Sequence, residues 1–518
     1  MLRKLCTRLF FIFCIPLILY LLLTVVFIHE SARQWISIPK LFQQMFATVR
    51  SVGVISAQKT TFFLKNAQQP VIIGDYFSVI IETRNSTGQH CKSGGDFWFA
   101  TIRSHKGNAA GKVIDFNNGT YEVIFFAGWT GKATVEIILV HPSETIDFIE
   151  EKLWPMKDRI IWKGVFSYNK KHETKTCRFG KQNEHLNQCV HSYPLALGQT
   201  VFLCEKPQIL SCDTLISLKS VSNHVEKKFS QLLHENKALF SKDVTYARLI
   251  NGPHAIEIIS TGSSSDVANE LMLPECTADL PTPLSDGFWI KNIWTSLQCK
   301  SKQWSKEEIM QCVKGKQFYF MGDSTTRQWS QGFLELLNLS TSQFTKIPNI
   351  KLTYHNSDVL NLTFHFHPYT IARRSCPYRI GRWEYEIMDN LNSSTCNYVL
   401  VISPWAHYTQ WVKQDYIERL YLLRDTILRL RERCPKTIFV VKTPKPRNHK
   451  TGTSLLYTGD GLLYDIREFF FKIFSGLGIH IIDVWDMNLA YPSSNNIHMP
   501  MQVIYQELQM FFSHVCKM

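Results

Sequence analysis

The sequence lacks the short cysteine spacings from which many metal sites are built. None of its 14 cysteines belongs to a C-x-x-C pair, so the spacing typical of zinc or iron–sulfur sites is absent. Internal repeats, low-complexity tracts and a Gly-rich phosphate-binding motif are also missing. Repeat architectures and P-loop chemistry are therefore excluded.

Acidic residues are the scarcer charged residues. There are 43 Asp and Glu against 57 Lys and Arg, which gives a formal net charge of +14. A basic chain suits an acidic partner such as nucleic acid, a membrane surface or an acidic glycan. With 45% hydrophobic residues over 518 positions, the chain is long enough for two or three globular domains.

Charged residues are absent from residue 9 to residue 28, directly after Arg3, Lys4 and Arg8. Such an apolar run is long enough to span a bilayer, and the preceding positive charges favour a cytosolic N-terminus. We therefore predict a signal anchor over residues 1–30, with the rest of the chain on the luminal side. A cleaved signal peptide, followed by secretion, is the alternative.

The remaining cysteines and the sequons agree with a secretory-pathway chain. Twelve cysteines follow the apolar run, an even number that is typical of disulfides in an oxidising compartment. Nucleic acid is then not an expected partner. Five N-x-S/T sequons predict glycosylation: Asn85, Asn118, Asn338, Asn361 and Asn392.

The residues after the predicted anchor divide into four segments by pattern. Residues 31–59 are predicted to be a stem or linker. Residues 60–150 contain short β-branched and aromatic runs separated by Gly- and Asn-rich turns, which is typical of a β-sandwich. Residues 151–285 contain four closely spaced cysteines and are predicted to be a disulfide-pinned connecting region.

Residues 286–518 have the pattern of an α/β domain. Continuous apolar runs such as FYFMG, NYVLVIS and TIFVVKT are typical of strands buried on both faces of a parallel sheet. Amphipathic segments between them predict helices, and the alternation predicts a doubly wound sheet. Functional groups of such sheets lie at the carboxyl ends of the strands.

Ser324 lies at one such strand end, in the sequence QFYFMGDSTTRQW. A serine at the entry to a helix exposes its hydroxyl, and backbone N–H groups near it can stabilise an oxyanion. Gly322 permits the tight turn. The alternative is a turn that merely ends a strand. An active serine also needs a base. His498, which follows the last predicted strand, is the first candidate and His407 the second.

Four segments resemble a known family: FYFMGDSTTRQW, GFWIKNIWTSLQC, VISPWAHYTQW and DVWDMNLAYPSSNNIHMP. They are similar to the PC-esterase branch of the SGNH hydrolases. Together with the β-rich N-terminal part, they resemble the neurexophilin and PC-esterase domain (NXPE) family. With the anchor predicted above, the resemblance implies an immunoglobulin-like sandwich followed by a doubly wound SGNH-type α/β domain. It implies Ser324 as nucleophile, His498 as base and Asp323 as a positioning residue. Arg327, Trp329 and His407 match residues of related plant acetyltransferases.

One position departs from the SGNH pattern. Asn495 stands where related proteins carry the aspartate that orients the catalytic histidine. Asp486 is the carboxylate that we predict in its place, whereas Asp483 is expected to be buried at a strand end. Loss of the acid also leaves open a catalytically inactive protein that binds a partner through its β domain.

The resemblance implies acyl transfer through an acyl-serine. We expect O-acetyl transfer to luminal glycans, including acidic sugars such as sialic acid, by a type II membrane protein of the Golgi. Acetyl-CoA is the expected acyl donor, and no tightly bound cofactor or metal is expected. An O-acyl esterase is the alternative with the same chemistry.

Overall fold

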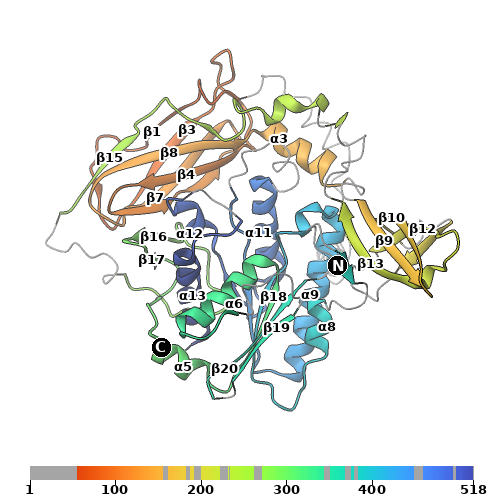
Figure 1. Ribbon diagram of the computed structural model, residues 1–518. Coiled ribbons are helices and arrows are strands. Elements are labelled where there is room, and N and C mark those ends of the chain that lie inside the picture. Colours follow the sequence, from red (N-terminus) through yellow and green to blue (C-terminus); the bar gives the residue numbers. More distant parts are fainter. Residues whose placement is uncertain are drawn as a thin grey trace, which may run out of the picture. The chain divides into compact units, whose positions relative to one another are not determined.

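The computed structural model describes most of the chain from residue 55 onward. The described ranges are 55–155, 161–181, 187–191, 200–221, 231–232, 234–261, 271–342, 351–356, 358–367, 375–377, 383–447, 459–493 and 497–516. Residues 54–518 form one compact unit. Figure 1 shows its helices and strands.

Two facing sheets build a β-sandwich in the N-terminal part. The first has the strand order β1-β3-β7-β6, and the second has the order β17-β16-β5-β4-β8-β15-β2, with β14 also paired to β8. Buried side chains alternate with exposed ones along the strands. The buried ones, which include Val79, Val123 and Ile137, form the core between the sheets. The strands are β1 Thr61–Leu64, β2 Val71–Ile72, β3 Tyr76–Glu82, β4 Phe97–Arg103, β5 Gly107–Ala110, β6 Lys112–Asp115, β7 Thr120–Phe126, β8 Gly131–His141, β14 Ala247–Arg248, β15 Ala255–Ile259, β16 Gly287–Ile290 and β17 Ile293–Ser296.

Strands of the sandwich come from outside the segment predicted to form it. β14 and β15 belong to the connecting region, and β16 and β17 belong to the predicted α/β domain. β16 pairs antiparallel with β5, and the Trp289 indole N–H donates to the Met487 carbonyl oxygen at 2.8 Å. The segment 287–296 therefore joins the sandwich to the C-terminal part.

The connecting region forms a separate six-stranded antiparallel sheet with the order β11-β12-β10-β9-β13-β21 (Figure 1). Disulfides Cys177–Cys204 and Cys189–Cys212 hold it, which confirms the prediction of disulfide bonds. The strands are β9 Ile161–Tyr168, β10 Lys171–Lys181, β11 Gln188–His191, β12 Thr200–Glu205, β13 Leu215–Val221 and β21 Ser375–Pro377. Short helices precede β9, lie between β12 and β13, or follow β13: α3 Ser143–Phe148, η1 Ile149–Leu153, η2 Cys212–Thr214 and η3 Lys237–Phe240.

The C-terminal sheet has the order β19-β20-β18-β22-β23-β24 and is parallel except at its edge strand β19. β22 is buried along its whole length, as expected for a sheet covered on both faces. The strands are β18 Gln317–Gly322, β19 Lys351–Asn356, β20 Leu360–Phe366, β22 Tyr398–Ser403, β23 Ile438–Lys442 and β24 His480–Ile482. The helices are α5 Lys306–Val313, α6 Ser324–Leu336, α8 Glu384–Asp389, η5 Tyr408–Gln410, α9 Lys413–Arg433, α11 Asp460–Phe474, α12 Trp485–Ala490 and α13 Met501–Val515.

Three further disulfides join distant parts of the chain: Cys276–Cys299, Cys312–Cys516 and Cys396–Cys434. The longest connection, from Cys312 to Cys516, spans 204 residues. It ties the end of α5 to the end of α13. Cys91 is a buried free thiol.

The predicted fold class needs correction. The predicted fold class was an anchor followed by one sandwich and one doubly wound domain. The described residues instead form a mixed α/β protein with four sheets, in which strands from one predicted segment join the sheet of another. Strand exchange was not foreseen because pairing between strands far apart in sequence leaves no local pattern. Across the ranges that the structure describes, no helix is long and apolar enough to cross a membrane. The anchor predicted over residues 1–30 lies outside those ranges, and the stem predicted over 31–59 lies mainly outside them.

Candidate active site

The turn between β18 and α6 presents Ser324 at the first position of a helix. Asp323 is the N-cap residue, and its Oδ1 accepts hydrogen bonds from the Thr325 backbone N–H and hydroxyl, both at 2.7 Å. This bond satisfies one of the amides that a helix start leaves without a partner. Gly322 is required because a Cβ there would come within 2.8 Å of the Ser403 carbonyl oxygen. The serine is thus fixed at the carboxyl end of a central strand.

His498 lies directly against this serine. Its Nε2 is 2.8 Å from the Ser324 Oγ. The histidine belongs to residues 497–500, which lead into α13, with Pro500 as the N-cap. The structure therefore brings together the nucleophile and the base predicted from the sequence, although they are 174 residues apart. In this geometry the imidazole can accept the proton of the hydroxyl.

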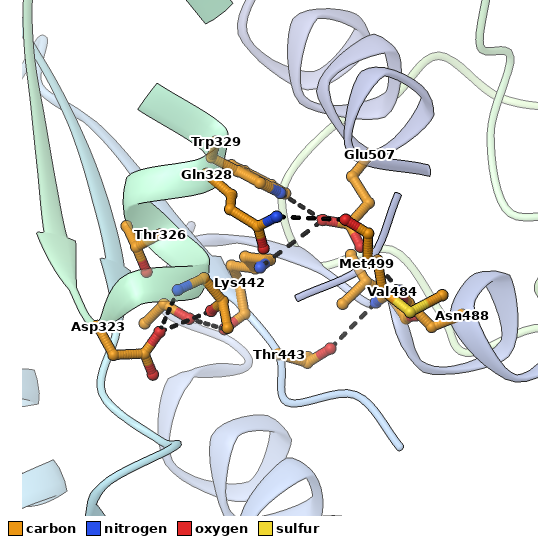
Figure 2. A network of polar contacts seen from close by, with 12 residues as sticks. Asp323, Thr326, Gln328, Trp329, Lys442, Thr443, Val484, Asn488, Met499 and Glu507 are labelled. Atoms are coloured by element: carbon orange, nitrogen blue, oxygen red, sulfur yellow. Dashed lines mark hydrogen bonds and ion pairs between the residues drawn. The ribbon is translucent and has the colours of Figure 1, made fainter. Parts of the chain in front are cut away.

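Asp323 is a buried carboxylate whose charge acts on His498. The residue has no exposed surface, and its Oδ2 accepts a hydrogen bond from the Ala406 backbone N–H at 3.0 Å. The same side chain thus caps α6 and binds the loop that follows β22. Figure 2 shows Asp323 at the start of α6. Its charge favours the protonated forms of both His407 and His498.

His407 is hydrogen-bonded to another histidine, and no contact of His407 with Ser324 is found among the described residues. Its Nδ1 is 2.7 Å from the Nε2 of His367, a residue that sequence reasoning missed. Burial is the main cause that lowers the pKa of His407 and places that of His367 well below the usual value. Both rings are therefore neutral at physiological pH, and they share one hydrogen bond.

The environment of His498 keeps its imidazole in the basic form. Crowding of the ring by protein lowers the pKa of His498, although the residue as a whole is exposed. Three cations act in the same direction, and the Asp323 carboxylate opposes them. The cations are Arg327, Lys445 and Arg447. A neutral ring can accept the serine proton at the pH of the secretory pathway.

Lys445 is the most deeply buried of these cations. Only 1% of the residue is exposed, and burial lowers the pKa of its ammonium to about 7, against the opposing charge of Glu507. It follows β23 by three residues and was not identified from the sequence. The loop PKPR carries two basic residues. Their position after a predicted strand was the sequence feature that could have indicated a place near the site.

Asp486 lies in another part of the protein. It lines a cavity of about 420 Å³ between sandwich residues such as Phe97 and Lys112 and α11 residues such as Arg467. Burial, and then the charge of Asp483, raises the pKa of Asp486 to about 6. Burial also raises the pKa of the neighbouring Asp286 well above its usual value. The described residues offer Asp323, rather than Asp486, as the carboxylate that acts on His498.

Trp329 and Gln328 tie α6 to the elements around it. The Trp329 indole N–H donates to a carboxylate oxygen of Glu507 on α13, and the Gln328 Nε2 donates to the Met499 carbonyl oxygen at 3.2 Å. Glu507 is fully buried; it also accepts from Asn488 Nδ2 at 2.8 Å, and one of its oxygens lies 3.7 Å from Lys442 Nζ. Figure 2 shows Trp329 and Lys442 extending toward Glu507. Trp329 is thus a structural anchor, whereas Gln328, Lys442 and Glu507 were missed because a buried polar contact has no sequence signature.

Asn495 and the five sequon asparagines are the remaining residues singled out from the sequence. Asn495 lies outside the described residues. Among the sequons, Asn118, Asn338 and Asn392 are exposed, and Asn361 is half-buried. Asn85 is only 4% exposed, and its Oδ1 accepts from the Thr87 and Gln89 backbone N–H groups. Glycosylation of the five stays a prediction.

Comparison with known proteins gives two family matches. A family model described as "NXPE family member 4-like, C-terminal domain" matches residues 294–516, and one described as "Neurexophilin" matches residues 58–240. These matches fit an acyltransferase or an esterase. Among solved structures, the crystal structure of the Lin-41 filamin domain is similar at 13% identity and a TM-score of 0.15, covering 17% of this chain and 83% of that chain.

Proposed function

Because this chain belongs to the neurexophilin and PC-esterase domain (NXPE) family, we propose that it is a serine O-acetyltransferase acting on luminal glycans. The observation that carries the proposal is the 2.8 Å contact between Ser324 Oγ and His498 Nε2. The position of Ser324 at the N-terminus of α6 adds a positive helix end next to the reacting oxygen.

The first half of the reaction forms an acyl-serine. Ser324 Oγ attacks the acyl carbonyl carbon while His498 Nε2 takes the hydroxyl proton. The developing oxyanion is stabilised by backbone N–H groups at the start of α6 and by Arg327. Collapse breaks the bond to the leaving group, which receives the proton from His498. The Asp323 carboxylate stabilises the imidazolium that exists between these steps.

The second half of the reaction transfers the acyl group. A sugar hydroxyl gives its proton to His498 and attacks the acyl carbon, and Ser324 leaves with that proton. An ester forms on the sugar and the free serine is restored. Acetyl-CoA is the proposed donor, and its thioester supplies the activated acetyl group.

Acidic sugars, such as sialic acid, are the proposed acceptors. Arg327, Lys445 and Arg447 all act on His498 as positive charges, so the reacting centre has a positive field that favours an anionic substrate. The luminal side of the Golgi is the proposed compartment, and the five disulfides support an oxidising environment. The sandwich is a candidate surface for a protein partner.

An O-acyl esterase is the second candidate. The exposure of His498 supports it, because water can reach the acyl-serine as readily as a sugar hydroxyl can. Chemistry up to the acyl-serine is common to both activities. The identity of the second substrate decides between them.

The test is to express full-length wild type and Ser324→Ala in cells and to measure O-acetyl groups on released glycans by mass spectrometry. A transferase raises O-acetylation in a Ser324-dependent way, with the largest change on sialylated glycans. An esterase lowers it. Equal profiles for wild type and Ser324→Ala would remove both activities and leave the binding protein.

A further inference from the structure

Among the described residues, the segment that carries His498 is held to α6 by a side-chain contact besides the Ser324–His498 hydrogen bond itself. Gln328 lies four residues after Ser324 on α6, so both side chains project from the same face of the helix. The Gln328 Nε2 donates to the Met499 carbonyl oxygen at 3.2 Å, one residue beyond His498. Figure 2 shows Gln328 extending from α6 toward this segment.

Among the described residues, the side-chain amide of Gln328 makes no hydrogen bond other than the one to Met499. Its Oε1 is buried and has no hydrogen-bond partner among the described residues. Met499 itself is 2% exposed, which fixes its side chain while His498 beside it remains exposed. The amide of Gln328 therefore acts on the backbone of the histidine segment.

The two helices on either side of this tether are already fixed. Trp329 bonds to Glu507 on α13, and Gly332 lets α6 approach α13 so closely that a Cβ would lie 3.0 Å from Leu508. Residues 497–500 are the link between these rigid elements that bears the base. Their position decides whether the imidazole reaches Ser324.

We propose that Gln328 is a positioning residue that holds the 497–500 segment so that His498 stays within hydrogen-bond distance of Ser324. This inference rests on the proposed role of Ser324 and His498 as nucleophile and base. It does not depend on the acyl donor or the acceptor. Without the tether, the exposed ring spends more time away from the hydroxyl, and the serine loses its base.

The experiment measures the rate at which a fluorophosphonate probe labels Ser324 in the purified full-length protein. The probe reacts with activated serines and needs neither acetyl-CoA nor a glycan. Gln328→Met keeps the side-chain volume but removes the donor, and Gln328→Ala is a second variant. Gln331→Met is the matched control, because Gln331 lies on the same helix and bonds to Glu335 at 2.8 Å.

We expect both Gln328 variants to label about 10- to 100-fold more slowly than wild type, since small misplacements of reacting groups have effects of this size. The pH midpoint of labelling should also move toward the ordinary imidazole value, because a released ring is better solvated. Gln331→Met should match wild type. Thermal unfolding of each variant reports whether it is folded, and a purely structural loss would leave the pH midpoint unchanged.

The outcomes separate this inference from the proposed function. Gln328→Met that labels at the wild-type rate with the wild-type midpoint overturns the positioning role while the transferase stands. Wild type that labels but transfers no acetyl group removes the transferase and leaves the positioning role in place. A folded wild type that does not label overturns both.

Discussion

At the scale of residues, the local charges decide how the Ser324–His498 pair works. Asp323 is buried and bonds to Thr325 and Ala406, so its carboxylate is held in place beside the site. Burial of the imidazole, and then the charges of three nearby cations, lower the pKa of His498 and keep the ring neutral. A neutral base next to a fixed anion is suited to take up a proton and to lose it again.

The first prediction concerns the pH dependence of serine reactivity. Because the pKa of His498 is lowered, labelling of Ser324 by a fluorophosphonate should rise with pH and level off below the ordinary imidazole value of about 6.5. Lys445→Met removes one of the cations that lower this pKa, so the midpoint should move to higher pH. Lys300→Met, at an exposed lysine near Glu275, is the control and should not move it. A midpoint that stays in place in Lys445→Met would contradict the role given to this charge.

The second prediction concerns Asp486 and stability. The folded-state pKa of this carboxyl is raised to about 6 from 3.8, so the folded protein keeps a proton that the unfolded chain releases. Its contribution to stability is present below about pH 4 and is lost as pH rises through 6. Asp486→Asn should raise the free energy of unfolding at pH 7.5, on the order of 3 kcal/mol at about 1.4 kcal/mol per pKa unit. Urea unfolding at pH 7.5 and pH 4 measures the effect, which should vanish at the lower pH.

The same variant also tests the sequence-based role of Asp486. If this residue does not orient His498, Asp486→Asn should label at the wild-type rate. A loss of labelling of 100-fold or more in the folded variant would return Asp486 to the catalytic site.

At the scale of elements, Glu507 joins four parts of the C-terminal region. Its carboxylate contacts Trp329 on α6, Asn488 on α12 and Lys442 on β23, and it lies on α13 itself. α6 begins with the nucleophile and α13 follows the base, so this buried group sets the relative position of both. A buried ion pair adds little net stability, but removing one partner leaves an uncompensated charge.

The third prediction follows from that asymmetry. Glu507→Gln should lower the free energy of unfolding by about 3–5 kcal/mol, because Lys442 is left buried without a carboxylate. Lys442→Met combined with Glu507→Met should be less destabilising than Glu507→Gln alone. Glu308→Gln is the control, since Glu308 forms an exposed pair with Lys302 and should change stability by less than about 1 kcal/mol. Urea unfolding measures all three, and equal losses in Glu507→Gln and Glu308→Gln would refute the argument.

At the scale of the whole molecule, segments far apart in the sequence supply strands to the same sheets. β16 and β17 add to the sandwich, and β21 adds to the sheet of the connecting region. The Cys312–Cys516 disulfide closes a loop across nearly the whole C-terminal region. Loss of a cross-link that spans so much chain releases more entropy in the unfolded state than loss of a short one.

The fourth prediction compares two disulfides. In the chain-entropy account, the 204-residue separation of Cys312 and Cys516 corresponds to roughly 5 kcal/mol, and the 38-residue separation of Cys396 and Cys434 to roughly 4 kcal/mol. Replacing Cys312 and Cys516 by serine should therefore lower the midpoint of thermal unfolding more than replacing Cys396 and Cys434. The reverse order in calorimetry would show that native-state packing outweighs chain entropy here.

The sequence by itself determined the local features of this protein. Residues 317–336 contain an apolar strand, a glycine, a capping aspartate and an amphipathic helix, and these place Ser324 at a strand end whatever lies around it. The apolar runs FYFMG, NYVLVIS and TIFVVKT form β18, β22 and β23 for the same reason, because buried strands have a short-range pattern. The place of His498 after the last predicted strand made it the first candidate base, and the NXPE resemblance implied the same residue.

Only the tertiary structure decided which distant groups meet. Whether Asp323 or Asp486 acts on His498 depends on how loops far apart in the sequence fold back, and a carboxylate has no local pattern that reveals its partner. The same holds for Gln328, Lys445 and Glu507, and for strands β14 to β17. Their contacts form between segments that are brought together by burial of the whole core, so no window of sequence contains them.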